Sequence, residues 1–167
     1  METIIGRKAE IKRLTVAVNS PRSEFIALYG RRRVGKTFLI NQMFRNQFTF
    51  KMTGVIEGTL KDQFIAFADA MSDYGYNIPE MPKDWMSAFI MLKNALKQKV
   101  NSGERCIIFI DELPAMDAEG SSVASAVGYF WNNWASQFDN IVFIICGSAT
   151  SWMITNVIDS KGGLYEA

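Results

Sequence analysis

The chain has 167 residues, of which 49% are hydrophobic and 21% are charged. A chain of this length buries about 68–70% of its unfolded surface, which is enough for one core without disulfides. Because 18 basic residues stand against 17 acidic ones, no overall field draws the chain to nucleic acid or anionic lipid. We therefore expect one domain spanning residues 1–167, no membrane partner, and nucleic-acid contact only through a local patch.

Cysteine and histidine usage narrows the chemistry further. Cys106 and Cys146 each lie in an apolar run, where a buried thiol behaves as a small hydrophobe. With two cysteines and no histidine, the chain builds neither a disulfide scaffold, nor a zinc site, nor a triad with histidine. METIIGRKAEIKRL lacks the apolar core of a leader, and no later run approaches the ~20 apolar residues of a membrane span. These features predict a cytoplasmic location.

Short apolar runs alternate with stretches of helical period, which indicates βαβ units and a parallel sheet. CIIFI and IVFIIC are apolar throughout, as expected for central strands covered on both faces. Pro79 and Pro82 mark YGYNIPEMPKD as a loop, while Asp84 and Ser121 or Ser122 are start signals for later helices. In chain order, we expect helix Lys8–Asn19, strand Phe25–Tyr29, helix Lys36–Phe44, strand Phe48–Thr53, helices Thr59–Tyr74 and Lys83–Val100, strand Cys106–Ile110, helix Ser122–Gln137, strand Ile141–Cys146 and helix Ser151–Ile158.

The segment ALYGRRRVGKTFLI contains the pattern G-x-x-x-x-G-K-[ST], with an apolar strand before it and a helix after it. Its glycines allow successive N–H groups to turn inward and form an anion nest at the positive end of the helix. We expect Lys36, as a solvated side chain, to contact the β- and γ-phosphates, and the Thr37 hydroxyl to bind Mg²⁺. The predicted nucleotide-binding residues are Gly30, Arg31, Arg32, Arg33, Val34, Gly35, Lys36, Thr37 and Phe38.

The three arginines of this loop have two interpretations. Side chains at its variable positions usually point away from the phosphates, so Arg31, Arg32 and Arg33 can serve solvation or pair with acidic neighbours. Arginine also suits bidentate phosphate contacts, so one of them can contact nucleotide or a neighbouring subunit. The sequence leaves both roles open.

A second acidic site follows from CIIFIDELPAMD. The carboxyl end of a strand in a parallel P-loop sheet lies beside the loop, so Asp111 is expected to hold Mg²⁺. We expect Glu112 to act as the general base on water. An Asp alone would suit a GTPase or a small-molecule kinase, whereas the Glu that follows suits an enzyme that hydrolyses its nucleotide through a carboxylate base. The lack of an Asn-Lys-x-Asp motif favours ATP over GTP.

The strand IVFIIC is followed by Gly147 and Ser148. If this strand lies between the two motif strands, Ser148 faces the γ-phosphate as a polar sensor. The alternative is that Ser148 caps the helix beginning near Ser151. In YFWNNWASQF, Trp131 and Trp134 are expected in the core or at a domain interface, with a partner or base-stacking surface as the alternative.

Four segments, IIGRKAEIKRL, LYGRRRVGKTFLI, IIFIDELPAM and IICGSATSWM, in this order and spacing resemble a prokaryotic P-loop ATPase family, the archaeal ATPase domain, which is similar to the AAA and STAND groups. The resemblance implies a three-layer sandwich of the additional-Glu class with sheet order 5-1-4-3-2. It also implies an adenine pocket at Ile5, Gly6 and Arg7, with Glu10 orienting that segment. Without the resemblance, GRKAEIKRL is also explained as the charged start of an amphipathic helix.

Members of this family usually continue into a fifth strand, a helical lid and often another domain, none of which the sequence contains after GGLYEA. We therefore expect an N-terminal ATPase-domain fragment in which strand 5 is missing. Arg105 is the last arginine, so a catalytic arginine placed after the sensor strand has to come from the missing part or another subunit.

The sequence as a whole predicts an ATP-binding domain that hydrolyses ATP to ADP and phosphate with Mg²⁺. The assigned roles are metal binding for Thr37 and Asp111, and catalysis for Glu112, Lys36 and Ser148. We expect ATPase activity in the intact protein and weak or no activity in the isolated chain. A nucleotide-dependent switch with negligible turnover and a small-molecule kinase are the alternatives.

Overall fold

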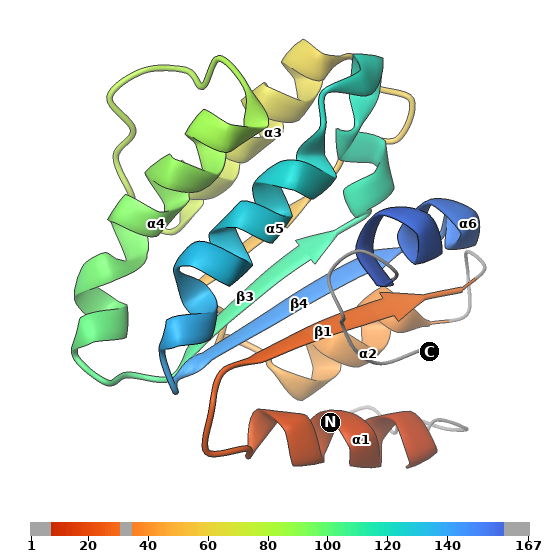
Figure 1. The fold of residues 1–167 in the computed structure, drawn as a ribbon, viewed down its shortest axis with the longest axis vertical. Coiled ribbons are helices and arrows are strands. Elements are labelled where there is room, and N and C mark those ends of the chain that lie inside the picture. Colours follow the sequence, from red (N-terminus) through yellow and green to blue (C-terminus); the bar gives the residue numbers. More distant parts are fainter. Residues whose placement is uncertain (1–7, 31–34, 159–167) are drawn as a thin grey trace.

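The computed structural model describes residues 8–30 and 35–158, which form a parallel sheet with helices on both faces (Figure 1). The four strands lie in the order β1, β4, β3, β2. The predicted α/β fold is confirmed, and the order matches the 1-4-3-2 part of the expected sheet. The expected absence of a fifth strand concerns the end of the chain, and residues 159–167 lie outside the described part. The strands are β1 (Glu24–Tyr29), β2 (Phe50–Thr53), β3 (Cys106–Asp111) and β4 (Ile141–Gly147).

The two central strands are β3 and β4, as their continuous apolar runs predict. Every residue of β3 and every residue of β4 is buried. Consecutive side chains of a strand point to opposite faces of the sheet. Where both faces are covered by helices, every side chain is buried, so the strand is apolar throughout. On β4, Phe143 faces one core cluster and Ile144 faces the other.

The helices divide into two layers, which Figure 1 shows on opposite faces of the sheet. The first layer comprises α1 (Lys8–Val18) and α2 (Lys36–Met43). The second comprises α3 (Leu60–Asp73), α4 (Trp85–Asn101) and α5 (Val123–Asn133), while the short α6 (Thr150–Met153) follows β4. None of the helices in the described ranges is both long and apolar enough to cross a bilayer.

Among the described helix starts, those of α3 and α4 have side-chain caps. The Thr59 side chain accepts from the Asp62 N–H and the Asp62 side chain accepts from the Thr59 N–H, which forms a capping box for α3. The Asp84 carboxylate accepts from the Ser87 N–H at 2.7 Å, and this bond holds the pKa of Asp84 below its ordinary value. The start signal at Asp84 is therefore confirmed, although α4 begins after the cap and not at the expected Lys83.

The expected helix Ser122–Gln137 is divided. It ends as an α-helix at Asn133, and Ala135–Gln137 forms a separate 3-10 turn. Between them Trp134 leaves helical geometry, with φ −138° and ψ −67°, and its ring packs 5.3 Å from Phe130 and 5.4 Å from Phe138, measured between ring centroids. The α-helix therefore ends one turn earlier than expected, at the point where the Trp134 ring packs against Phe130 and Phe138.

Other boundaries also differ from the expectation; for example, β1 begins at Glu24 and β3 ends at Asp111. The strand expected from Phe48 begins at Phe50, and the Thr49 hydroxyl accepts from the Ile107 N–H at 3.1 Å. The helix expected over Ser151–Ile158 consists of α6 and a π-helical turn over Ile154–Ile158.

Gly147 ends β4 where three elements meet. A Cβ at this position would lie 2.7 Å from Pro114 Cδ and 2.9 Å from Met153 Sδ. Pro114 belongs to the turn after β3, and Met153 belongs to α6. The missing side chain therefore lets this turn and α6 approach the end of β4.

We expect Gly147→Ala to lower the free energy of unfolding by about 1–3 kcal/mol, because the added methyl forces Pro114 or Met153 to move. Denaturant unfolding followed by circular dichroism measures the loss. The exposed Ser151→Ala is the control and should stay within about 0.5 kcal/mol of wild type. Equal stability of Gly147→Ala and wild type would contradict the close packing.

Candidate functional site

The carboxyl ends of three parallel strands meet at one edge of the sheet. Because β4 pairs with β1 on one side and β3 on the other, the residues after these strands become neighbours. Gly30 follows β1, Glu112 follows β3 and Ser148 follows β4. Strand β4 therefore lies between β1 and β3, which is the arrangement that the sensor interpretation of Ser148 requires.

Gly35 forms the start of α2. Its φ of 84° and ψ of 17° lie in the left-handed region, where a residue with a side chain is strained. Gly35, the N-cap of α2, offers no side-chain cap, and the N–H groups of the first turn of a helix are donors that suit an anion. A phosphate is an anion of the right charge for this position.

Lys36 differs from the sequence expectation. It was expected to be solvated, but its side chain is only 6% exposed. Its Nζ donates to the Gly30 carbonyl oxygen at 2.9 Å, so the ammonium folds back across the loop. A buried positive charge therefore lies beside the Gly30 carbonyl and the start of α2.

Thr37 and Asp111 connect the loop to β3. The Thr37 hydroxyl donates to Asp111 Oδ2 at 2.7 Å, and the Glu112 N–H donates to Asp111 Oδ1 at 2.9 Å. Asp111 is 4% exposed, so these donors stabilise a carboxylate that is almost out of water. The structure brings together the two residues that the sequence assigns to metal binding.

These two oxygens suit a small, hard cation. Mg²⁺ takes oxygen ligands and usually binds through one or two protein groups, with water and phosphate oxygens completing its shell. Thr37 Oγ1 and Asp111 Oδ2 are adjacent and belong to different segments. The pair therefore fits the metal that the sequence predicts.

Glu112 adopts a backbone conformation that is rare for a residue with a side chain. Its φ is 53° and its ψ is 45°. Such a conformation costs about 1–3 kcal/mol, and it persists where the surrounding structure imposes it. Ser148 Oγ donates to Glu112 Oε2 at 3.3 Å, which links the ends of β4 and β3.

A second set of contacts, which sequence reasoning missed, supports the turn after Glu112. The turn is a 3-10 helix, Leu113–Met116, and the buried Trp85 Nε1 donates to the Met116 carbonyl at 2.8 Å. Asp117 Oδ2 accepts from Trp152 Nε1 of α6 at 3.1 Å. The second Asp of DELPAMD was the available signal for this brace, but nothing in the sequence pairs it with a tryptophan.

The thiol of Cys146 lies within the electrostatic field of this site. Burial, with the Asp111 and Glu112 carboxylates, raises the pKa of Cys146 far above its ordinary value, while Lys36 opposes the shift. The thiol is free and buried, as the apolar run predicts. Cys146 therefore packs behind the charged groups as a neutral side chain.

Several of the predicted nucleotide-binding residues lie outside the described part of the chain. Ile5, Gly6 and Arg7, and the loop residues Arg31, Arg32, Arg33 and Val34, lie outside the described residues. Their roles stay predictions. Phe38 is described and is 43% exposed on the first turn of α2.

Comparison with known sequences identifies the family to which the chain belongs. Residues 4–166 match the model of a family described as an ATPase domain predominantly from Archaea. An uncharacterized protein of Methanocaldococcus jannaschii is 32% identical over 165 residues. That alignment covers 96% of this chain and 33% of the relative, so the chain spans about a third of that protein.

Solved structures show the same fold. The ORC2 protein of Aeropyrum pernix, in ADPNP-ADP complexes, has a TM-score of 0.63 at 16% identity, over 98% of this chain and 47% of that one. Cdc6p of Pyrobaculum aerophilum has a TM-score of 0.65 at 14% identity, over 99% and 45%. A Walker-type ATPase of Pyrococcus abyssi has a TM-score of 0.60 at 16% identity, over 96% and 50%.

We expect Thr37→Val to lower the free energy of unfolding by about 1–3 kcal/mol, because the buried Asp111 carboxylate loses a donor. Thr53→Val, at the exposed end of β2, is the matched control and should leave stability almost unchanged. Thermal and denaturant unfolding without nucleotide measure both variants. If Thr37→Val is as stable as Thr53→Val, the Thr37–Asp111 bond does not contribute as described.

Proposed function

Because the chain belongs to the family of ATPase domains found predominantly in Archaea, we propose that it binds ATP with Mg²⁺ at the carboxyl edge of its sheet and hydrolyses the bond between the β- and γ-phosphates. The observation that carries this proposal is the pair of side-chain bonds that joins three segments. Thr37 bonds to Asp111 at 2.7 Å, and Ser148 bonds to Glu112 at 3.3 Å. A phosphate-binding loop, a metal-binding carboxylate and a second carboxylate thus share one edge.

Each residue has a role set by its position. The N–H groups at the start of α2 and the Lys36 ammonium bind the phosphates, and Lys36 exchanges the Gly30 carbonyl for a phosphate oxygen. Thr37 and Asp111 hold Mg²⁺, which when bound neutralises charge on the β- and γ-phosphates.

Glu112 is the proposed general base and Ser148 its partner. A carboxylate that accepts a proton from water makes the water a better nucleophile toward the γ-phosphorus. In the structure one oxygen of that carboxylate accepts from Ser148. This bond supports the proposal that Ser148 orients Glu112 and contacts the γ-phosphate when ATP is bound.

No arginine follows β4 in the sequence, so a catalytic arginine at a position after that strand would come from another segment or subunit. Arg105, the last arginine of the sequence, lies immediately before β3 and so at the opposite edge of the sheet from the site. Positive charge on the transferring phosphoryl group is a large part of catalysis in many P-loop enzymes. We therefore propose that a further segment or another subunit supplies it, and that residues 1–167 alone turn over slowly.

The same contacts favour a second candidate, a nucleotide-dependent switch with negligible turnover. The Ser148 bond engages the Glu112 carboxylate, and the Asp117–Trp152 bond connects the turn after Glu112 to α6. A rearrangement at Glu112 would therefore reach α6. Saturable ATP binding without measurable phosphate release, even with a longer chain or added partner subunits, would favour this candidate.

We expect Lys36→Ala to lose affinity for Mg-ATP by at least about tenfold, because it removes a charge that contacts phosphate in the proposed complex. Calorimetric titration measures the affinity, with Mg-GTP run alongside and ATP expected to bind more tightly. Lys12→Ala, on α1, is the control, and circular dichroism confirms that both variants are folded. Equal ATP affinity in Lys36→Ala and wild type would remove the phosphate-site assignment.

We expect Glu112→Gln to retain Mg-ATP affinity within about threefold and to lower phosphate release by about a hundredfold or more, because the amide accepts from Ser148 but cannot serve as a base. Single-turnover hydrolysis with a longer chain or partner subunit measures the effect. Glu57→Gln is the matched control at an exposed site. Unchanged phosphate release by Glu112→Gln would show that another group activates the water.

A further inference from the structure

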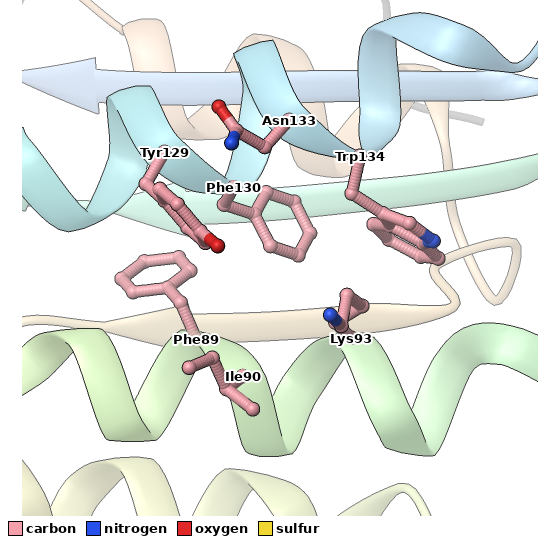
Figure 2. A pocket seen from close by; sticks show the side chains of 7 residues that line it. All are labelled: Phe89, Ile90, Lys93, Tyr129, Phe130, Asn133 and Trp134. Carbon is pink, nitrogen blue, oxygen red and sulfur yellow. The ribbon is translucent and has the colours of Figure 1, made fainter.

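A cavity of about 120 Å³ opens between α4 and α5, away from the residues of the proposed nucleotide site. Figure 2 shows Phe89, Ile90 and Lys93 on the α4 side. Facing them are four residues from α5 and its C-terminal end, Tyr129, Phe130, Asn133 and Trp134. Apolar cavities of about 150 Å³ hold benzene, so this one has room for a single Leu, Ile or Met side chain.

Exposed apolar side chains of α4 and α5 lie at and near the cavity. Met86 and Ile90 are one helical turn apart on α4 and are 36% and 38% exposed, while Tyr129 of α5 is 46% exposed. Large apolar side chains exposed singly are normal on a protein surface, but Ile90 and Tyr129 line the same cavity and Met86 lies one helical turn from Ile90. We call Met86, Ile90, Lys93, Tyr129 and the cavity the α4–α5 groove.

The charged side chains within α4 are all lysines, and α5 has no charged side chain. The exposed side of α4 continues from Ile90 to Lys93 and Lys97, which follow the spacing of one helical face. Neither α4 nor α5 contains an Asp or a Glu. A second copy of the chain would bring its own lysines against these in a symmetric dimer, and such like-charge contact disfavours self-association.

We propose that the α4–α5 groove binds an amphipathic helix of a partner protein, which inserts one apolar side chain into the cavity and places carboxylates beside Lys93 and Lys97. Helices recognised in grooves present apolar residues at i, i+3 or i+4, and i+7, and the exposed Met86, Ile90 and Tyr129 offer apolar contacts to such a face. The interaction goes beyond ATP binding, because the two sites share no residue.

The test uses three fluorescein-labelled, stapled helical peptides and no nucleotide. The first has leucines at i, i+4 and i+7 with glutamates on both flanks. The second replaces the central leucine with serine, and the third replaces every glutamate with lysine. Fluorescence anisotropy with the wild-type chain should show saturable binding of the first peptide and binding weaker by about tenfold or more for the other two.

Variants locate the binding site. Ile90→Glu and Lys93→Glu should each weaken binding of the first peptide by about tenfold or more, because they place a carboxylate in the groove. Val16→Glu, at a side chain 65% exposed on α1, is the control and should bind like wild type. Thermal unfolding confirms that each variant is folded, and Lys93→Glu decides the outcome if Ile90→Glu is not.

Three results would overturn the proposal. The first is no binding of the glutamate peptide, and the second is equal binding of the glutamate and lysine peptides. The third is a wild-type dimer in sedimentation experiments that Ile90→Glu dissociates, which would make a second copy the occupant. Because all readings are taken without nucleotide, failure here is independent of failure to bind ATP.

Discussion

The parallel pairing of β4 between β1 and β3 is the constraint on which the rest of the structure depends. Glu24 to Tyr29 pair in register with Val142 to Gly147, and β3 pairs along the other side of β4. This arrangement sends three strand ends to one edge and buries β4 on both faces, which requires an unbroken apolar strand. A slip of one residue would exchange the two core layers and separate Ser148 from Glu112 at the same time.

Much of this arrangement could be predicted because it rests on local patterns. Apolar runs identified the strands, and the glycine–lysine–threonine and Asp–Glu motifs identified the segments at the site. The breaks at Trp134 and after Met153, the burial of Lys36 and the bond between Asp117 and Trp152 depend on contacts between segments distant in sequence. The periodicity of apolar residues reports local secondary structure and does not predict such contacts.

The site is built at a cost to stability. Asp111 and Lys36 are both almost fully buried, and Glu112 holds a left-handed backbone conformation. Burial of a charge is unfavourable unless other groups compensate, and Thr37, the Glu112 N–H and the Gly30 carbonyl supply that compensation. The apolar layers on both faces of the sheet provide the stability against which these costs are small. Local rules of conformation are thus broken where polar groups converge, as is common at functional sites.

The two buried thiols have a consequence for how the domain responds to acidity. The sequence contains no histidine, and burial raises the pKa of both Cys106 and Cys146. Histidine is the side chain whose ordinary pKa lies between about pH 5 and 8, so no histidine contributes to a pH dependence of stability in that range. Only above about pH 8.5 would thiols ionise in the unfolded chain while staying neutral in the folded one, which then favours unfolding. The thiols therefore lower the stability of the folded domain in alkaline solution, above the physiological range of pH.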